Sequence, residues 1–182
     1  MNASQFVLSL IHACGNKVNG RTFLQKTGYF VSLLTGLPVD LRYHAHYYGP
    51  YSATMDGTLT QLSNLGFVEE ASTGFGVVSG GFEMRRYDYC LTKDGEEICK
   101  PLLNTPEYNA IAEAVRKIRD AGQPDYMELS IAAKAFFILQ KQGKGMTGSE
   151  LLKEAGNFNW NIPEQSLVRA VEFLKRVQLA KA

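Results

Sequence analysis

The stretch YYGPYSATMDGTLTQLSNLGFVEE (47–70), followed after a glycine-rich gap by FEMRRYDYCLTKDGEEI (82–98), decides the fold. Its first half predicts a helix over 51–65 and the start of a strand at Phe67. Its second half predicts a return strand over 82–91 and a helix capped by Thr92. Helix, strand, turn, strand and helix in this order are typical of the last part of a winged helix-turn-helix. That fold usually places its middle helix in a DNA groove.

Apolar residues recur at helical spacing along most of the remaining chain. Gly36 and Pro38 end the second helix, and the sequence GQPD at 122–125 predicts a domain boundary. We therefore expect an α+β fold: a mostly helical winged helix-turn-helix domain with a β-hairpin wing and a helical extension over 1–121, then a small all-α helix-turn-helix-like module over 122–182. The expected helices are 4–14, 21–35, 51–65, 92–103, 107–121, 127–140, 148–154 and 163–177, with an extended segment over 41–48.

Composition argues against a general nucleic-acid binder. The 182 residues include 19 basic and 18 acidic ones, a formal net charge of +1, so any DNA binding needs a local basic patch. The three cysteines show no CxxC or zinc-finger spacing, which fits a reduced setting. Because neither a signal peptide nor a membrane-spanning run is visible, we expect a cytoplasmic protein that does not associate with membranes.

Three short motifs resemble known families. The run YCLTKDG (89–95) after the expected wing resembles winged-helix regulators of the MarR and PadR types. The pair FLQKTGYF (23–30) and YGPYS (48–52) resembles the YwgA-type family of bacterial and archaeal proteins. The same pair is similar, more distantly, to the Panacea antitoxin/SocA-like domain, in which an LQK helix precedes a YGP turn. The resemblance covers about the first 105 residues. It implies a winged-helix-like fold and a role in regulation, phage-linked systems or toxin neutralisation, without catalytic residues.

Side chains that could read DNA are sparse. The helix over 51–65 contains no lysine or arginine, and Asp56 would repel phosphate. Arg85 and Arg86 point to opposite faces of the return strand, so at most one of them can reach a groove. A helix that packs as scaffold, or that faces a protein partner, is the alternative. The candidate DNA contacts are Gln61, Asn64, Arg85, Arg86, Lys93, Arg169 and Arg176.

The tip of the expected wing is apolar rather than basic. Phe75, Val77 and Val78 indicate a contact with a protein partner or with a second copy of the chain. The alternative is that these side chains fold back onto the domain.

A cluster of histidines and tyrosines suggests a ligand site. His44 and His46 share one face of an extended segment and could chelate a metal or, with Tyr48, bracket an anion. Asp40 falls on the same face, but two histidines on a strand are more often surface or interface residues. We expect neither a metal nor a cofactor, and the tyrosines can equally be packing residues.

Two functions remain open at this stage. The first is a winged-helix regulator, dimeric and acting on transcription through DNA. The second is a protein-interaction module, antitoxin-like or adaptor-like, without DNA contact. A small-ligand sensor or an enzyme ranks third, since the chain contains no nucleophile elbow or HExxH sequence, and no carboxylate pair in a recognisable context.

Overall fold

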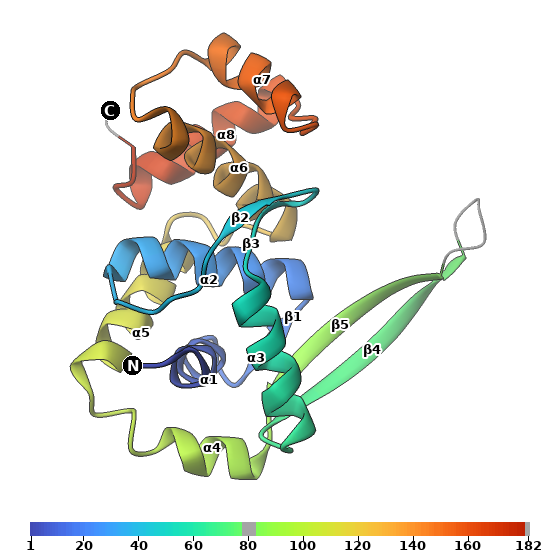
Figure 1. The fold of residues 1–182 in the computed structure, drawn as a ribbon, viewed down its shortest axis with the longest axis vertical. Coiled ribbons are helices and arrows are strands. Elements are labelled where there is room, and N and C mark those ends of the chain that lie inside the picture. The colour runs from blue at the N-terminus through green and yellow to red at the C-terminus, as the bar shows by residue number, and fades with distance from the viewer. Residues whose placement is uncertain (78–82, 181–182) are drawn as a thin grey trace.

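The computed structural model describes residues 1–77 and 83–180. A helical body with small antiparallel sheets carries a long β-hairpin that projects away from it (Figure 1). The fold is therefore of the α+β class. Its elements are α1 (Ala3–Ala13), β1 (Lys17–Asn19), α2 (Arg21–Thr35), β2 (His44–His46), β3 (Gly49–Tyr51), α3 (Ala53–Asn64), β4 (Val68–Val77), β5 (Glu83–Leu91), α4 (Lys93–Cys99), α5 (Pro106–Asp120), α6 (Tyr126–Gln142), α7 (Gly148–Asn157) and α8 (Glu164–Arg176).

The larger sheet has the order β1-β5-β4, and all of its pairs are antiparallel. Tyr89 of β5 lies opposite Val18 of β1 on one side and opposite Glu70 of β4 on the other. Val18, Val68 and Tyr89 are buried, which seats the base of the hairpin on the body. The register shifts between Gly74 and Val77, where the hairpin is far from the body (Figure 1).

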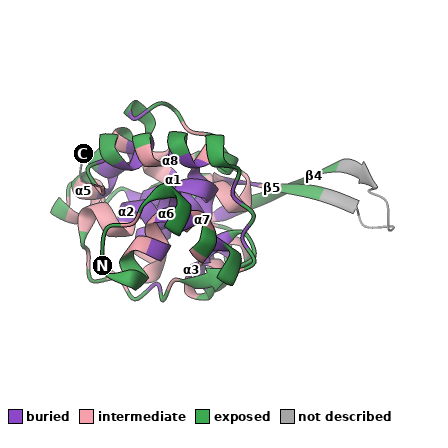
Figure 2. Cartoon of the chain, turned by 90° about the horizontal axis from the view of Figure 1, so that it is seen from above, coloured by how far each residue is buried: buried purple, intermediate pink, exposed green. Residues whose placement is uncertain are grey.

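Helix α2 is the centre of the core. Its residues Leu24, Phe30 and Val31 are at most 1% exposed, and the helix packs against both α5 and α6. The ring of Phe30 meets that of Phe173 on α8 edge to face, with centroids 5.2 Å apart. Buried residues form one continuous cluster through the body, as the purple segments of Figure 2 show. Each such side chain stabilises the fold by about 1.5–3 kcal/mol.

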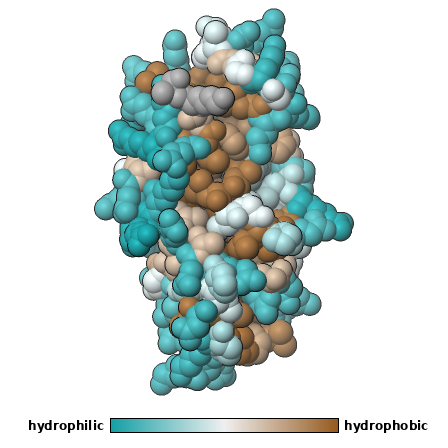
Figure 3. Space-filling model, turned by 90° about the vertical axis from the view of Figure 1, so that its left-hand side faces the viewer, coloured by the Kyte–Doolittle hydropathy of each residue, from teal (hydrophilic) through white to brown (hydrophobic). Residues whose placement is uncertain are grey.

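Some apolar side chains are only partly covered. Leu33, Leu34, Leu37 and Leu179 pack against the core without being fully enclosed. On the face viewed in Figure 3, apolar side chains gather in a hollow bordered by polar ones.

Most expected elements form, with corrected ends. The helix over 21–35 is confirmed, and Gly36 adopts the left-handed conformation at its end. Helix α3 begins at Ala53 instead of residue 51, because the Ser52 hydroxyl accepts a hydrogen bond from the Met55 amide at 2.9 Å. Helix α4 ends at Cys99 instead of residue 103, and a series of turns follows it.

The extended segment predicted for 41–48 is only partly correct. Its strand is limited to His44–His46, which turns at once and pairs with Gly49–Tyr51. Strand β1 was not predicted, since three residues with one buried side chain give almost no pattern.

Candidate functional site

The outer side of α3 is uncharged. Met55, Leu59 and Leu62 face the core. Asp56 is half-buried and lies 3.6 Å from the Arg21 guanidinium, so its charge is matched within the protein. The exposed residues of this helix are small or neutral: they are Ala53, Gly57, Thr60, Gln61 and Asn64.

Arg21 ties the base of the hairpin to the helices. Its Nε donates a hydrogen bond to the Tyr89 hydroxyl at 2.8 Å, and its Nη2 lies 3.3 Å from a Glu70 carboxylate oxygen. The guanidinium also lies 4.9 Å from the centre of the Tyr87 ring. One side chain at the start of α2 thus holds α3, β4 and β5 in place.

Strand β4 has an open edge. The Thr92 amide donates to the Phe67 carbonyl at 3.1 Å, and the Leu91 amide donates to the Asn16 carbonyl at 2.9 Å. In an antiparallel pair these bonds alternate along the strand. It follows that the backbone groups of Glu69, Ala71 and Thr73 face β5. Those of Glu70 and Ser72 face outward, where the described part of the chain provides no further strand.

The charge near this edge is negative on balance. The sequence segment 53–91 contains five acidic side chains (Asp56, Glu69, Glu70, Glu83, Asp88) and two basic ones (Arg85, Arg86), a net charge of −3. Arg21 of α2, which pairs with Asp56 and Glu70, reduces this balance to −2. Arg86 is engaged by both carboxylate oxygens of Asp88, at 2.8 and 2.9 Å. Phosphate groups would be repelled here on average.

The candidate DNA contacts lie on several surfaces. Gln61 and Asn64 are exposed on α3, Arg85 and Arg86 are exposed on β5, and Lys93 is exposed at the start of α4.

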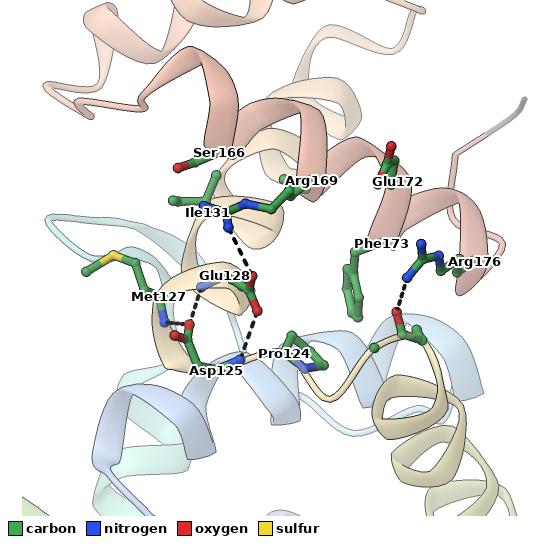
Figure 4. Close-up of a pocket in the computed structure, with 13 residues that line it drawn as sticks. Pro124, Asp125, Met127, Glu128, Ile131, Ser166, Arg169, Glu172, Phe173 and Arg176 are labelled. Atoms are coloured by element: carbon green, nitrogen blue, oxygen red, sulfur yellow. Dashed lines mark hydrogen bonds and ion pairs between the residues drawn. The ribbon is translucent and has the colours of Figure 1, made fainter.

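Arg169 and Arg176 lie apart from these residues, on α8 (Figure 1). They line a pocket of about 260 Å³ between α8 and the start of α6 (Figure 4). There an Arg169 nitrogen lies 4.0 Å from a Glu128 oxygen, and Arg176 donates to the Ala121 carbonyl at 3.0 Å. The structure therefore does not join the α8 arginines to α3 in one surface.

The predicted contact at the wing tip stays a prediction. Phe75 and Val77 belong to the last part of β4. Val78 lies outside the described residues.

The histidine and tyrosine cluster forms the hairpin β2–β3. The rings of His44 and His46 both contact Tyr51, with centroids 5.8 and 5.0 Å away, so the two histidines do share a face. Tyr48 is 58% exposed. Within the described residues, no three or more His, Cys, Asp or Glu side chains come together in a group that could hold a metal ion.

The hairpin β2–β3 docks onto the C-terminal helices through its backbone. The Ser130 hydroxyl on α6 donates to the Tyr48 carbonyl at 2.7 Å, and the Trp160 indole donates to the His46 carbonyl at 2.7 Å. Gly49 has φ +96°, and a Cβ there would lie 3.0 Å from Cγ of Lys134. The turn therefore needs glycine both for its conformation and for its closeness to α6.

Lys26 holds the same turn from the other side. Its residue is 2% exposed, and its Nζ donates to the Pro50 carbonyl at 2.6 Å. Burial, with a smaller contribution from the charge of Lys134, lowers the pKa of Lys26 from 10.5 to about 7. Next to it, the Gln25 amide exchanges two hydrogen bonds of 3.0 Å with the backbone of Ser52. The motifs LQK and YGP are thus the two halves of one contact.

Sequence reasoning missed the role of Lys26, although a signal was present. Lys26 follows Phe23 by three residues and precedes Phe30 by four, which places it on the apolar side of the helix. A lysine at such a position is rarely left fully buried without a function or a partner.

Two of the cysteines are poor nucleophiles. Burial raises the pKa of Cys14 to about 12 and that of Cys99 to about 11, so both thiols stay protonated at neutral pH.

No protein-family model matches the sequence, and no curated protein matches it. The resemblance to the YwgA-type and Panacea-like proteins therefore stays a hypothesis. Among the described helices, none combines the length and the apolar character needed to span a bilayer.

Proposed function

We propose that the protein is a regulatory interaction module whose partner is another protein. The proposed architecture is a winged helix: α1, β1, α2, α3, β4 and β5 occur in the order of that fold, with β4–β5 as the wing and the hairpin β2–β3 inserted between α2 and α3. The observation that carries the function is the character of α3 and β4, which combine an uncharged helix face with an open strand edge in a segment of net charge −3.

The partner binds by adding a strand to β4. Main-chain groups of Glu70 and Ser72 supply its hydrogen bonds, and the residues 71–74 (Ala, Ser, Thr, Gly) are small and exposed, so another backbone can approach closely. Natural edge strands are often protected by lysine or proline. Strand β4 contains neither residue.

DNA binding is the competing candidate. Its specific support is the exposure of Gln61 and Asn64 on α3 and of Arg85 on β5. Against it stands the net charge of −3 over 53–91, since phosphate neutralisation supplies most of the affinity for non-specific DNA.

The proposal is tested with a proline in the open edge. Proline at residue 72 removes an outward-facing N–H and leaves the ladder to β5 intact. Tagged wild type, Ser72→Pro and the control Ser72→Ala are used to capture proteins from the native host, and the captured protein is then purified and titrated. We expect wild type and Ser72→Ala to bind it and Ser72→Pro to lose it. Equal binding by all three would contradict strand addition.

The same three proteins are titrated with duplex DNA of random sequence at low salt. The proposal expects no salt-sensitive binding. Tight binding that Arg85→Ala abolishes would instead establish the DNA-binding regulator.

A further inference from the structure

A second, smaller site lies beside the hairpin β2–β3. It is a pocket of about 330 Å³, within the size range of small-molecule sites. Its walls come from the start of α2 and from β2 and β3, and none of its lining residues is acidic. They are Arg21, Thr22, Gln25, Lys26, His46, Tyr48 and Tyr51.

The two cations of this pocket differ in whether a carboxylate lies beside them. Arg21 lies next to Asp56 and Glu70, as described above. Lys26 has no ion pair with any described carboxylate, and the Pro50 carbonyl is its one hydrogen-bond acceptor among the described residues. An ammonium group has three N–H donors, so two of them lack a protein acceptor in a residue that is 2% exposed.

The surroundings of Lys26 add positive charge rather than removing it. Lys134 on α6 is close enough to act on it electrostatically. A buried cation without a counter-ion is costly. An oxyanion in the pocket would remove this cost and would supply the missing acceptors.

We propose that this pocket binds the phosphate group of a small molecule, with Lys26 as its buried counter-charge. The hydroxyl of Thr22 provides a further donor to the same group, whereas the Tyr51 hydroxyl already bonds the Asp56 carboxylate. The ring of Tyr48, which is largely exposed at the rim, provides a wall against which a flat part of the ligand can lie. This site is separate from the edge of β4 and does not depend on the function proposed for it.

Three probes test the site at constant ionic strength and pH 6.5: inorganic phosphate, adenosine 5′-monophosphate and adenosine. Binding is followed by calorimetry and by the shift in Tm. We expect phosphate and the nucleotide to bind and adenosine not to bind. If the nucleotide binds more tightly than phosphate, its base contributes to the affinity through contact with the Tyr48 ring. If the two bind equally, the phosphate group alone accounts for the affinity. Both results support the site.

Variants separate this site from general ion effects. Lys26→Met should weaken both phosphate probes at least tenfold, whereas Lys153→Met, an exposed lysine on α7, should leave them unchanged. Tyr48→Ala keeps the backbone carbonyl that Ser130 contacts and should not weaken phosphate. If Lys26→Met does not fold, Thr22→Val removes one donor with little change of shape and should weaken phosphate several-fold. Absence of phosphate binding to the wild type, or equal binding to Lys26→Met, would overturn the proposal.

Discussion

At the scale of single residues, two cations of α2 organise the N-terminal half in different ways. Arg21 is surrounded by Asp56, Glu70 and the Tyr89 hydroxyl, so its charge serves to join α3 to the hairpin. Lys26, which is nearly inaccessible, faces a single carbonyl. Arg21 stabilises the fold, whereas Lys26 is a buried cation that the proposed phosphate ligand would neutralise.

Lys26 makes the stability of the protein depend on pH. Its pKa is about 7 in the folded state and 10.5 as the ordinary value. Between these values the unfolded chain holds a proton that the folded chain does not, so the free energy of unfolding rises with pH, by about 1 kcal/mol per pH unit. Below pH 7 both states are protonated and this contribution to stability is lost.

The measurement is urea denaturation between pH 7 and 8.5 of wild type, Lys26→Met and the control Lys153→Met. Lys26→Met should be more stable than the wild type at pH 7, and the difference should shrink as the pH rises. A difference that does not change with pH would show that the Lys26 ammonium is not buried in its charged form.

Arg21 should contribute more to the free energy of unfolding than an exposed ion pair does. Arg21→Met leaves the hydroxyl of buried Tyr89 without its donor and removes the cation beside Asp56 and Glu70, so we expect a loss of about 2 kcal/mol in the free energy of unfolding. Lys100→Met, which removes an exposed pair with Glu97, should cost less than about 0.5 kcal/mol. Chemical denaturation of both variants checks this, and equal losses would contradict the role of Arg21.

At the scale of elements, local signals predicted the helices well and the short strands poorly. Gly36 and Pro38 correctly predicted the end of α2. The caps Thr92 and Thr147 are confirmed, because their hydroxyls accept hydrogen bonds from the Gly95 and Glu150 amides. The hairpin β2–β3 could not be derived in this way. Its position depends on Ser130, which lies 82 residues further along the chain.

Two glycines of the same region should respond in opposite directions. At Gly95 of α4, a Cβ would lie 2.0 Å from the Phe67 carbonyl oxygen, so Gly95→Ala should destabilise the protein by about 3 kcal/mol. At Gly57, in the exposed middle of α3, a Cβ meets nothing within 4 Å. Gly57→Ala should therefore stabilise the protein by about 0.5–1 kcal/mol. Thermal denaturation of the pair measures both changes, and a common sign would contradict the close approach of Gly95 to the Phe67 carbonyl.

At the scale of the whole molecule, the candidate site was predictable in outline and not in detail. The neutral character of α3 can be read from its residues. The outward-facing groups of Glu70 and Ser72 depend on the register with β5, and the burial of Lys26 depends on contacts with the YGP turn. Such long-range pairings leave no periodic signal in the sequence.

The contacts of α2 also bear on how the molecule unfolds. Because α2 packs on α5 and α6, and Phe30 contacts Phe173, the segments 1–121 and 122–182 should unfold together. Trp160 is the one tryptophan of the chain, is 3% exposed and reports on the second segment. Its fluorescence and the far-ultraviolet circular dichroism should give the same Tm. Two separate transitions would show instead that 122–182 is an independent domain.

The homodimer expected from the sequence can be tested on the same edge. If the added strand comes from a second copy, sedimentation should show a dimer for wild type and Ser72→Ala and a monomer for Ser72→Pro. A dimer that persists in Ser72→Pro would place that contact elsewhere on the molecule.

The most direct measurement is the affinity of the purified partner protein for wild type, Ser72→Ala and Ser72→Pro, set beside the affinity of the same proteins for duplex DNA. We predict that the partner binds wild type and Ser72→Ala alike, that proline at residue 72 weakens it at least tenfold, and that DNA binds none of them. DNA binding that falls with salt and is lost in Arg85→Ala, with no effect of the proline, would contradict the proposed function.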